Sequence, residues 1–226
     1  IRTLLYTPEA EAVYASQLSA LKAACGDVYE ITSALSRAIS DTSTPQGVFC
    51  ICELLDNRSG LDKIVNIKTS KMGYLALENI QDPSNMGAVI RTAEAFGLDG
   101  LLLSDGCCDV YNPKVLRGSM GGVFRLQLLF VGSMTVAVER LKAAGIDCRA
   151  CVVDRDAVPL PKAGLTKECI CVIGNEGNGL RPETAAACSG RITIPMAGRA
   201  ESLNAAMAAG IVMWEMARTT ELSFME

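Results

Sequence analysis

The sequence predicts an α/β fold with a mainly parallel sheet and helices on both of its faces. From residue 73 onward, short apolar runs of strand length alternate with segments of helical character. Strands that alternate with helices are typical of parallel sheets, because each helix returns the chain to the same edge of the sheet. Half of the 226 residues are hydrophobic, which suffices for one large domain or two small ones.

Residues 1–56 are predicted to form a smaller unit before this sheet. Residues 7–26 open with a threonine, a proline and two acids and close with a glycine, a pattern that marks a helix. A strand at 28–31, a short helix at 32–40 and a buried strand at 47–55 follow. Residues 57–72 are more polar, and we take them as the boundary with a second domain, 73–226.

The second domain is predicted from apolar runs that are bounded by turn residues. Strands are expected at residues 73–80, 100–104, 125–130, 146–153, 168–174 and 191–196. Helices are expected at residues 84–96, 112–119 and 135–144, after Pro182, and from about 203 to 218.

Charge and composition restrict the chemistry. The net charge of −4 counts mildly against a nucleic-acid binder, although a local basic cluster matters more than the sum. The chain has no histidine, so no Ser-His-Asp or Cys-His arrangement can form. Any proton transfer near neutral pH must use another group.

The ten cysteines are expected to be reduced thiols in a cytoplasmic protein. Only Cys148 and Cys151 have the C-x-x-C spacing, and a zinc site would need a second such pair, so no metal is expected. Four others alternate inside apolar runs, where a thiol acts as a small hydrophobe: Cys50, Cys52, Cys169 and Cys171. No apolar run is long enough to span a bilayer, and we expect no signal peptide from the residues that open this sequence.

Polar segments follow three predicted strands, at the sheet edge where α/β proteins bind ligands. The first is NIQDPSNMGAVIRTAEAFG, residues 79–97, in which Gly87 costs the helix about 1 kcal/mol relative to alanine. Because helical side chains lean toward the N-terminus, Arg91 lies over Gly87 and can reach the anion-binding helix start and Asn85. Alternatively, Arg91 pairs with Glu94 and Gly87 permits close packing.

The second and third segments are rich in glycine and small residues. In GNEGNGL, residues 174–180, the glycines allow backbone amides and carbonyls to come close to a ligand. The segment matches neither the dinucleotide-binding fingerprint nor a P-loop. It is compatible both with a nucleotide or nucleoside site and with a plain turn. In the third, residues 192–218, Ser202 is predicted to cap the last helix. A stripe at helical spacing is interpreted as core or subunit interface: Leu203, Met207, Gly210, Ile211 and Trp214.

A fourth, weaker segment is YNPKVLRGSMGGVFR, residues 111–125. Two cations and two hydrogen-bonding side chains occur there within a short span: Asn112, Lys114, Arg117 and Ser119. This combination suits phosphate contact. Ordinary exposed surface charge is the alternative.

Together these segments resemble the SpoU (TrmH) family of RNA ribose 2′-O-methyltransferases, in the SPOUT superfamily. Three motifs occur in the family's order: residues 79–93, residues 174–180, and Ile194-Pro195-Met196 with Glu201-Ser202-Leu203-Asn204. The segment at residues 112–121 also has a family counterpart. The resemblance runs from about residue 72 to the end, and residues 1–56 resemble the later part of a small ribosomal-protein-like RNA-binding module.

The resemblance implies a C-terminal trefoil knot, which general rules of chain connection would not predict. It also implies S-adenosyl-L-methionine as cofactor and a homodimer. The implied cofactor contacts are Gly174, Asn175, Glu176, Gly179, Ile194, Met196, Ser202, Leu203 and Asn204. The implied catalytic residues are Arg91, Asn85, Glu176, Ser202 and Asn204, and the implied RNA contacts are Arg91, Lys114, Arg117 and Ser119.

The implied activity is cofactor-dependent 2′-O-methylation of a ribose in structured RNA, with ribosomal RNA favoured. A transfer-RNA methyltransferase and a catalytically silent RNA-binding relative are the alternatives. A Rossmann-type enzyme would need a glycine fingerprint after its first strand and a later acid, which this sequence lacks, whereas a different α/β small-molecule enzyme that uses the same turns stays open. Because a guanidinium stays charged in proteins, we expect Arg91 to stabilise developing alkoxide charge and fix a phosphate. The proton would leave to phosphate, water or Glu176.

Overall fold

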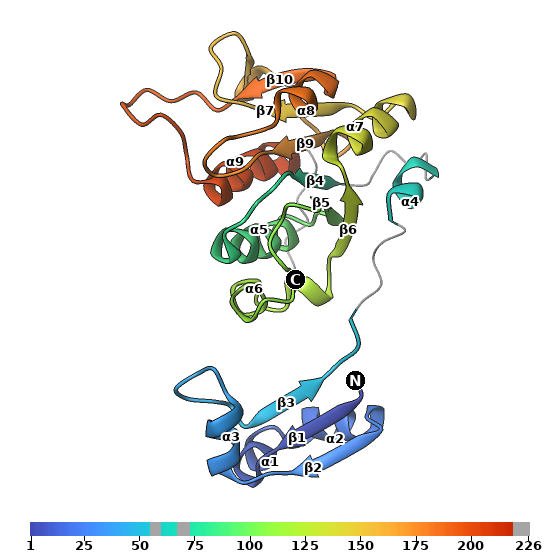
Figure 1. The fold of residues 1–226 in the computed structure, drawn as a ribbon, viewed down its shortest axis with the longest axis vertical. Coiled ribbons are helices and arrows are strands. Elements are labelled where there is room, and N and C mark those ends of the chain that lie inside the picture. Colours follow the sequence, from blue (N-terminus) through green and yellow to red (C-terminus); the bar gives the residue numbers. More distant parts are fainter. Residues whose placement is uncertain (55–59, 67–72, 219–226) are drawn as a thin grey trace. The chain divides into compact units, whose positions relative to one another are not determined.

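The computed structural model describes residues 1–54, 60–66 and 73–218 of the chain (Figure 1). The chain divides into two compact units, Ile1–Asp56 and Asn57–Glu226. Within the described ranges, no helix combines the length and the apolar character that crossing a membrane requires.

The first unit contains a three-stranded sheet in the order β2-β1-β3. The central strand β1 (Thr3–Tyr6) pairs in parallel with β2 (Asp27–Glu30) and antiparallel with β3 (Val48–Ile51). The helices are α1 (Pro8–Val13), α2 (Ala15–Ala24) and α3 (Ser33–Ile39). The core of this unit is small and is built around Leu4, Tyr6 and Leu18.

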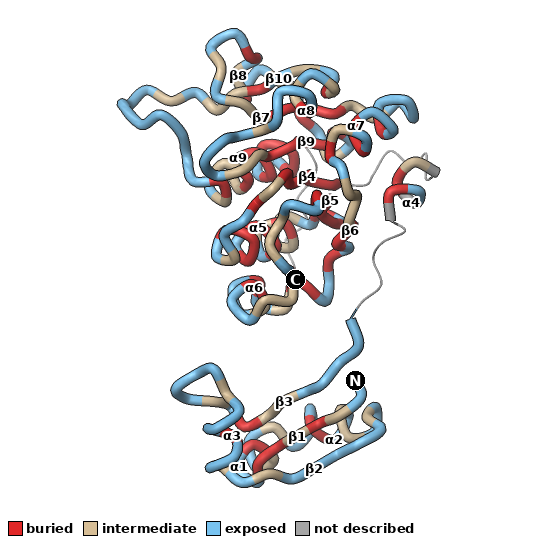
Figure 2. Tube along the Cα trace, viewed as in Figure 1, coloured by how far each residue is buried: buried red, intermediate tan, exposed pale blue. Residues whose placement is uncertain are grey.

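Two predictions for this unit were wrong. The single helix expected at residues 7–26 is broken at Tyr14, which adopts non-helical angles between α1 and α2, although Thr7 caps α1 as expected. The strand expected to be buried at 47–55 is short and largely exposed, with Cys50, Ile51 and Cys52 open to solvent (Figure 2). Among the described residues, β3 pairs only with β1, so it is an edge strand beside a small core.

The second unit contains, in its described part, a seven-stranded sheet with the order β6-β5-β4-β9-β7-β10-β8. The strands are β4 (Tyr74–Leu77), β5 (Gly100–Ser104), β6 (Gln127–Gly132), β7 (Cys148–Cys151), β8 (Val158–Pro159), β9 (Ile170–Ile173) and β10 (Gly190–Thr193). Every neighbouring pair is parallel, which confirms the predicted sheet type. Only the two-residue β8 was not predicted. The trefoil knot stays a prediction.

Helices cover both faces of this sheet, as predicted (Figure 1). They are α4 (Gly60–Asn66), α5 (Pro83–Ala95), α6 (Pro113–Gly118), α7 (Met134–Ala143), α8 (Pro182–Ala187) and α9 (Ala205–Arg218), with short 3-10 helices η1 (Gly122–Phe124) and η2 (Leu160–Lys162). Successive strand residues point to opposite faces. Leu75 and Leu77 therefore pack with α5 and α9, whereas Tyr74 and Ala76 pack with α7.

The predicted boundary region contains a helix. Leu61 and Ile64 of α4 are buried in the same core cluster as α7. Residues 57–59 and 67–72 of that region lie outside the described residues.

Gly87 has a packing role, because α6 lies directly against it. A Cβ atom at residue 87 would lie 3.1 Å from the Cα atom of Gly118 and 3.2 Å from the carbonyl oxygen of Val115. The alternative in which Gly87 permits close packing is therefore the one that the structure shows. The close approach also fixes where α6 and its cations lie relative to α5.

Candidate functional site

A cavity of about 460 Å³ lies at the carboxyl edge of the seven-stranded sheet. Strands β4, β9, β7 and β10 are neighbours and parallel, so the loops that leave them converge at this edge. The segments after β7, β9 and β10 and the start of α9 line the cavity. Its size is that of a small-molecule site.

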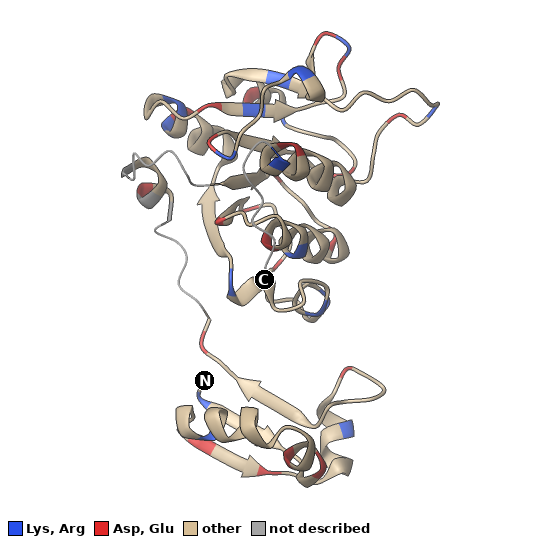
Figure 3. Cartoon of the chain, turned by 180° about the vertical axis from the view of Figure 1, so that it is seen from behind, with Lys and Arg blue, Asp and Glu red and all other residues tan. Residues whose placement is uncertain are grey.

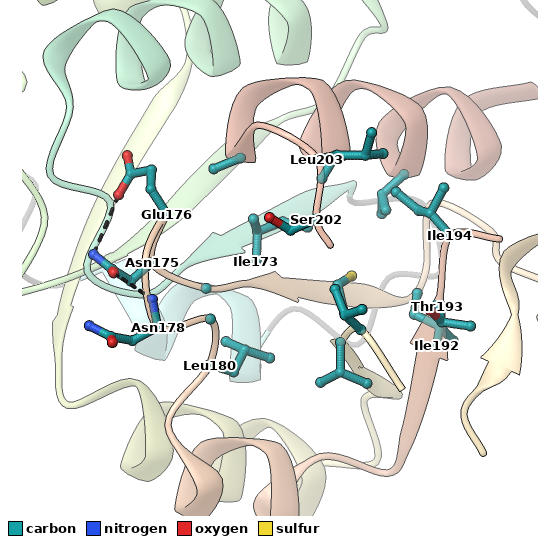
Figure 4. A pocket seen from close by; sticks show the side chains of 18 of the residues that line it. Ile173, Asn175, Glu176, Asn178, Leu180, Ile192, Thr193, Ile194, Ser202 and Leu203 are labelled. Atoms are coloured by element: carbon teal, nitrogen blue, oxygen red, sulfur yellow. Dashed lines mark hydrogen bonds between the residues drawn. The ribbon is translucent and has the colours of Figure 1, made fainter. Parts of the chain in front are cut away.

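One wall of the cavity is apolar, which we call the apolar bed, and another wall is polar (Figure 4). Ile173, Ile192 and Val212 are buried side chains that contribute to the bed. Figure 4 shows Asn175, Glu176 and Asn178 on one side and Ile192, Thr193 and Ile194 on the other. Eight of the nine predicted cofactor contacts line the cavity: Gly174, Asn175, Glu176, Gly179, Ile194, Met196, Ser202 and Leu203.

The loop at residues 174–180 is a closed turn with a narrow neck. The backbones of Asn175 and Gly179 exchange two hydrogen bonds, of 3.0 and 2.9 Å, and the Asn175 side-chain oxygen accepts from the Gly177 N–H at 2.9 Å. Gly179 has φ +68°, in the left-handed region that favours glycine. A Cβ atom on Gly174 would lie only 2.2 Å from the Gly179 carbonyl carbon and the Leu180 nitrogen.

A line of hydrogen bonds joins the three motif segments. The Asn204 amide donates to the side-chain oxygen of Asn85 at 2.9 Å, and the Asn85 amide donates to Oε1 of Glu176 at 3.0 Å. Asn85 is 6% exposed, so its orientation depends on these partners. The structure therefore brings together three of the predicted catalytic residues, with Ser202 lining the adjoining cavity.

Glu176 also binds the backbone just before α5. Its carboxylate accepts from the N–H groups of Gln81 at 3.3 Å and Asp82 at 3.2 Å. Burial raises the pKa of Glu176, but hydrogen bonds from Asn85 and from backbone N–H groups outweigh burial and hold the pKa below its ordinary value. Glu176 is therefore ionised at neutral pH and is a weak proton acceptor.

We expect Glu176→Gln to change how stability depends on pH. A carboxylate whose folded pKa is depressed stabilises the fold fully above its ordinary pKa of 4.5, and this contribution is lost as the pH falls through the folded value. The stability difference between wild type and variant should stay constant from neutral pH to about 5 and shrink below 4.5. Urea denaturation at a series of pH values measures it.

Glu183→Gln is the matched control, because Glu183 is exposed on α8 and its side chain makes no hydrogen bond to the described residues. This variant should show no such trend. A Glu176 difference that stays flat through the acid range would contradict the inferred contacts.

Arg91 lies on an exposed position of α5. Among the described residues it has no side-chain hydrogen bond or ion pair, and Glu94 instead pairs with Arg125. The predicted alternative of an Arg91–Glu94 pair is therefore wrong. The expected reach of Arg91 to Asn85 is also not seen, which leaves the guanidinium available to a ligand.

The structure corrects two further side-chain predictions. Ser119 is fully buried and donates its hydroxyl to the Leu116 carbonyl at 2.9 Å, so it does not offer a phosphate contact. Ser202 does not cap the last helix: α9 starts at Ala205, and the Asn204 side-chain oxygen accepts from the backbone N–H groups of Ala206 at 3.0 Å and Met207 at 3.2 Å. Asn204 itself does not line the cavity.

Several cavity residues were missed from the sequence. Cys151, Val152 and Val153 line the cavity at the end of β7. The rule that ligands bind where parallel strands end could have indicated them. Leu160 comes from η2, and no pattern in the sequence marks it.

Comparisons with known proteins bear on the same segments. The model of the SpoU rRNA Methylase family matches residues 72–214. The 23S rRNA (guanosine(2553)-2′-O)-methyltransferase RlmP of Bacillus subtilis is 29% identical over 188 residues, which are 83% of this chain and 71% of RlmP. The 23S rRNA (uridine(2479)-2′-O)-methyltransferase of Streptomyces viridochromogenes is 35% identical over 162 residues, 70% of this chain and 56% of that protein.

A solved structure shares the fold. The AdoMet-bound rRNA methyltransferase from Sinorhizobium meliloti superposes with a TM-score of 0.84 at 30% identity. The match covers 99% of this chain and 81% of that one. Similarity therefore extends over both units of this chain, whereas the chain spans a little over half of the Streptomyces relative.

Proposed function

The chain belongs to the SpoU rRNA Methylase family, and we propose that it transfers a methyl group from S-adenosyl-L-methionine to a ribose 2′-hydroxyl of ribosomal RNA. The observation that carries this proposal is the cavity at the sheet edge, which is lined by the second and third motifs and joined to the first by the Asn204–Asn85–Glu176 line. The names of both rRNA methyltransferase relatives support ribosomal RNA as the substrate class.

The cavity fits this cofactor. An apolar bed that includes Ile173, Ile192 and Leu160 suits an adenine ring, and the backbone at Gly174 is bare enough for close contact. Two carboxylates, Glu176 and Glu201, line the cavity and favour a positively charged ligand. The cofactor would supply a methyl group on a positively charged sulfur.

Arg91 is the residue that we assign to the ribose-phosphate acceptor. Its guanidinium stays protonated, so it acts by stabilising the negative charge that develops on the ribose oxygen and by holding a phosphate. Glu176 is a poor acceptor for the ribose proton because its pKa is lowered. We therefore assign the proton to water or to an RNA phosphate, and we assign Glu176 to holding Asn85 and the start of α5.

The RNA-binding surface is proposed to include the cations on α5 and α6. Lys114 and Arg117 are exposed on α6, which packs against α5, the helix of Arg91 (Figure 3). Nζ of Lys114 lies 3.9 Å from Oδ1 of Asp82. Because both side chains are exposed and the contact is long, this ion pair does not fix the position of Lys114. A local basic surface of this kind is compatible with the acidic net charge.

Arg117→Ala is expected to weaken RNA binding several-fold and to lower the slope of log affinity against log salt concentration by about one, since one phosphate contact is lost. Filter binding at several salt concentrations measures both. The control is Arg140→Ala on α7, at the opposite sheet face, where an exposed pair with Asp62 contributes little. Equal losses in the two variants would exclude this surface.

We also propose a homodimer that is formed through α9. The apolar stripe on α9 is not core: Met207 is 62% exposed, Ile211 36% and Trp214 47%. Trp214 packs against Phe96 at 5.7 Å between ring centroids, which widens the apolar surface. A two-fold axis lets one apolar surface cover its own copy, and a stable dimer buries about 800 Å² per partner.

Met207→Glu should convert the dimer to monomer, because it places a charge in the centre of this surface. Light scattering after size exclusion should then report 23.9 kDa in place of twice that mass. Val136→Glu, at an apolar α7 residue that is 52% exposed, is the matched control and should leave the mass unchanged. A wild-type monomer, or a dimer that survives Met207→Glu, contradicts the assignment.

We propose that the first unit, Ile1–Asp56, assists in binding the RNA substrate. We also propose a cytoplasmic location, which agrees with the ten free cysteines. The test of the activity uses methyl-labelled S-adenosylmethionine with separated ribosomal and transfer RNA. Alkali-resistant linkages map the modified nucleotide. If only transfer RNA is labelled, the substrate is transfer RNA and not ribosomal RNA. If the protein binds the cofactor but transfers no methyl group, it is a catalytically silent relative.

A further inference from the structure

Glu78 is a buried acid that no step of the proposed reaction uses. It lies directly after β4 and is 2% exposed. Removing a carboxylate from water is costly unless hydrogen bonds or a cation compensate. No cation of the described residues forms an ion pair with it, so the compensation comes from neutral donors.

Both carboxylate oxygens of Glu78 are held by donors from the segment that follows the loop at residues 174–180. The backbone N–H of Arg181 donates to Oε2 at 2.9 Å, and the Thr184 hydroxyl donates to Oε1 at 2.6 Å. The Thr184 hydroxyl is also 2.8 Å from the hydroxyl of Thr135 on α7. Thr184 is fully buried, so this is a fixed arrangement inside the fold.

Glu78 and Glu176 hold the same loop from opposite ends. Glu176, near the loop entry, binds backbone N–H groups before α5, and the Asn175 amide donates to the Asn79 carbonyl at 2.8 Å. Glu78, in the β4 segment, binds the backbone N–H that directly follows Leu180. The loop is therefore fastened to the residues around β4 at its entry and at its exit.

The exit matters because it forms cavity wall. Gly179 and Leu180 line the cavity, and their backbone lies so close to Gly174 that no Cβ fits between them. Glu78 itself does not line the cavity. Its side chain acts on the cavity through the position of residues 179–181.

We propose that Glu78 is a positioning residue for the cofactor: it fixes the loop exit so that the Gly179–Leu180 backbone keeps the shape that binds the adenosine end. This inference rests on the proposed function. It predicts an effect on cofactor affinity rather than on the methyl-transfer step at saturating cofactor.

The test is Glu78→Leu, read by calorimetry with S-adenosylmethionine and with S-adenosylhomocysteine. We expect both dissociation constants to rise about tenfold, because the Arg181 N–H loses its acceptor. Turnover at saturating cofactor should stay within about twofold, since the catalytic groups are untouched. Glu78→Gln should restore most of the affinity: its amide oxygen can accept from Arg181 while its NH₂ group donates to Thr184.

Thr135→Val separates positioning from general stability. It removes a hydroxyl that is hydrogen-bonded to Thr184 but leaves both bonds of Glu78 in place. Its melting temperature should fall while its cofactor affinity stays at the wild-type value. If Glu78→Leu fails to fold, Thr184→Val replaces it, with a rise of about threefold in the dissociation constant, as expected for the weaker of two losses.

The inference is overturned if the folded Glu78 or Thr184 variant binds both ligands like the wild type, if Thr135→Val loses affinity equally, or if Glu78→Gln gives no recovery. These results leave the proposed function intact, because the wild type still binds and transfers. A wild-type protein that binds neither ligand overturns the proposed function and this inference with it.

Discussion

Gly174→Ala is expected to weaken S-adenosylmethionine binding by about tenfold to a hundredfold. The added methyl group would lie 2.2 Å from the Gly179 carbonyl carbon and the Leu180 nitrogen, and both are backbone atoms that no rotamer change can move. The neck of the loop must open, at a strain cost of about 1–3 kcal/mol. Each 1.4 kcal/mol by which the loop conformation that binds the cofactor is destabilised lowers the affinity by about a factor of ten.

Gly177→Ala is the matched control in the same turn. A Cβ atom there meets only the Asn175 side-chain oxygen, at 3.5 Å, which is an ordinary contact. Calorimetry should therefore find near-wild-type affinity for Gly177→Ala. Equal affinities of the two alanine variants would mean that the narrow neck is not part of the cofactor site.

Arg91→Lys should reduce turnover by about a hundredfold while S-adenosylmethionine affinity stays unchanged. The charge remains, but lysine lacks the planar fork that can hold a phosphate and a developing alkoxide together. Losing one preorganised donor to such a charge typically costs about 10²–10³ in rate. Arg91 makes no ion pair within the described part of the chain, so its loss should leave the fold stable.

Single-turnover methyl transfer with saturating RNA measures this effect apart from RNA affinity. Arg125→Lys is the control, because Arg125 is also exposed but is paired with Glu94. It should retain wild-type turnover. An Arg91→Lys variant that keeps wild-type turnover would rule out a bidentate role for this arginine.

The parallel sheet and the position of its site were predictable because their causes are local. Apolar runs at residues 73–80 and 168–174 mark buried strands, and polar or glycine-rich residues directly after them mark the sheet edge where ligands bind. The helix cap at Thr7 was visible in the same way. Where the role of a side chain depends only on residues of its own segment, the sequence pattern is enough to predict that role.

Features that the sequence left open or mispredicted depend on where elements begin and on what packs against them. Gly87 is bare because of Gly118, and Ser119 is buried because α6 packs against α5. Both Ser202 and Asn204 are good capping residues, and only the helix start at Ala205 decides between them. The exposure of β3 follows from its edge position, which an apolar run does not reveal.

The Asn204–Asn85–Glu176 line has a bearing on the order in which the protein matures. Its two hydrogen bonds join residues 119 and 91 positions apart. Contacts over such separations form late, since the intervening chain must first be brought together. Because the start of α9 lines the cavity, we expect S-adenosylmethionine to bind only after α9 has docked. A ligand that binds in this way stabilises the completed unit and does not direct its folding.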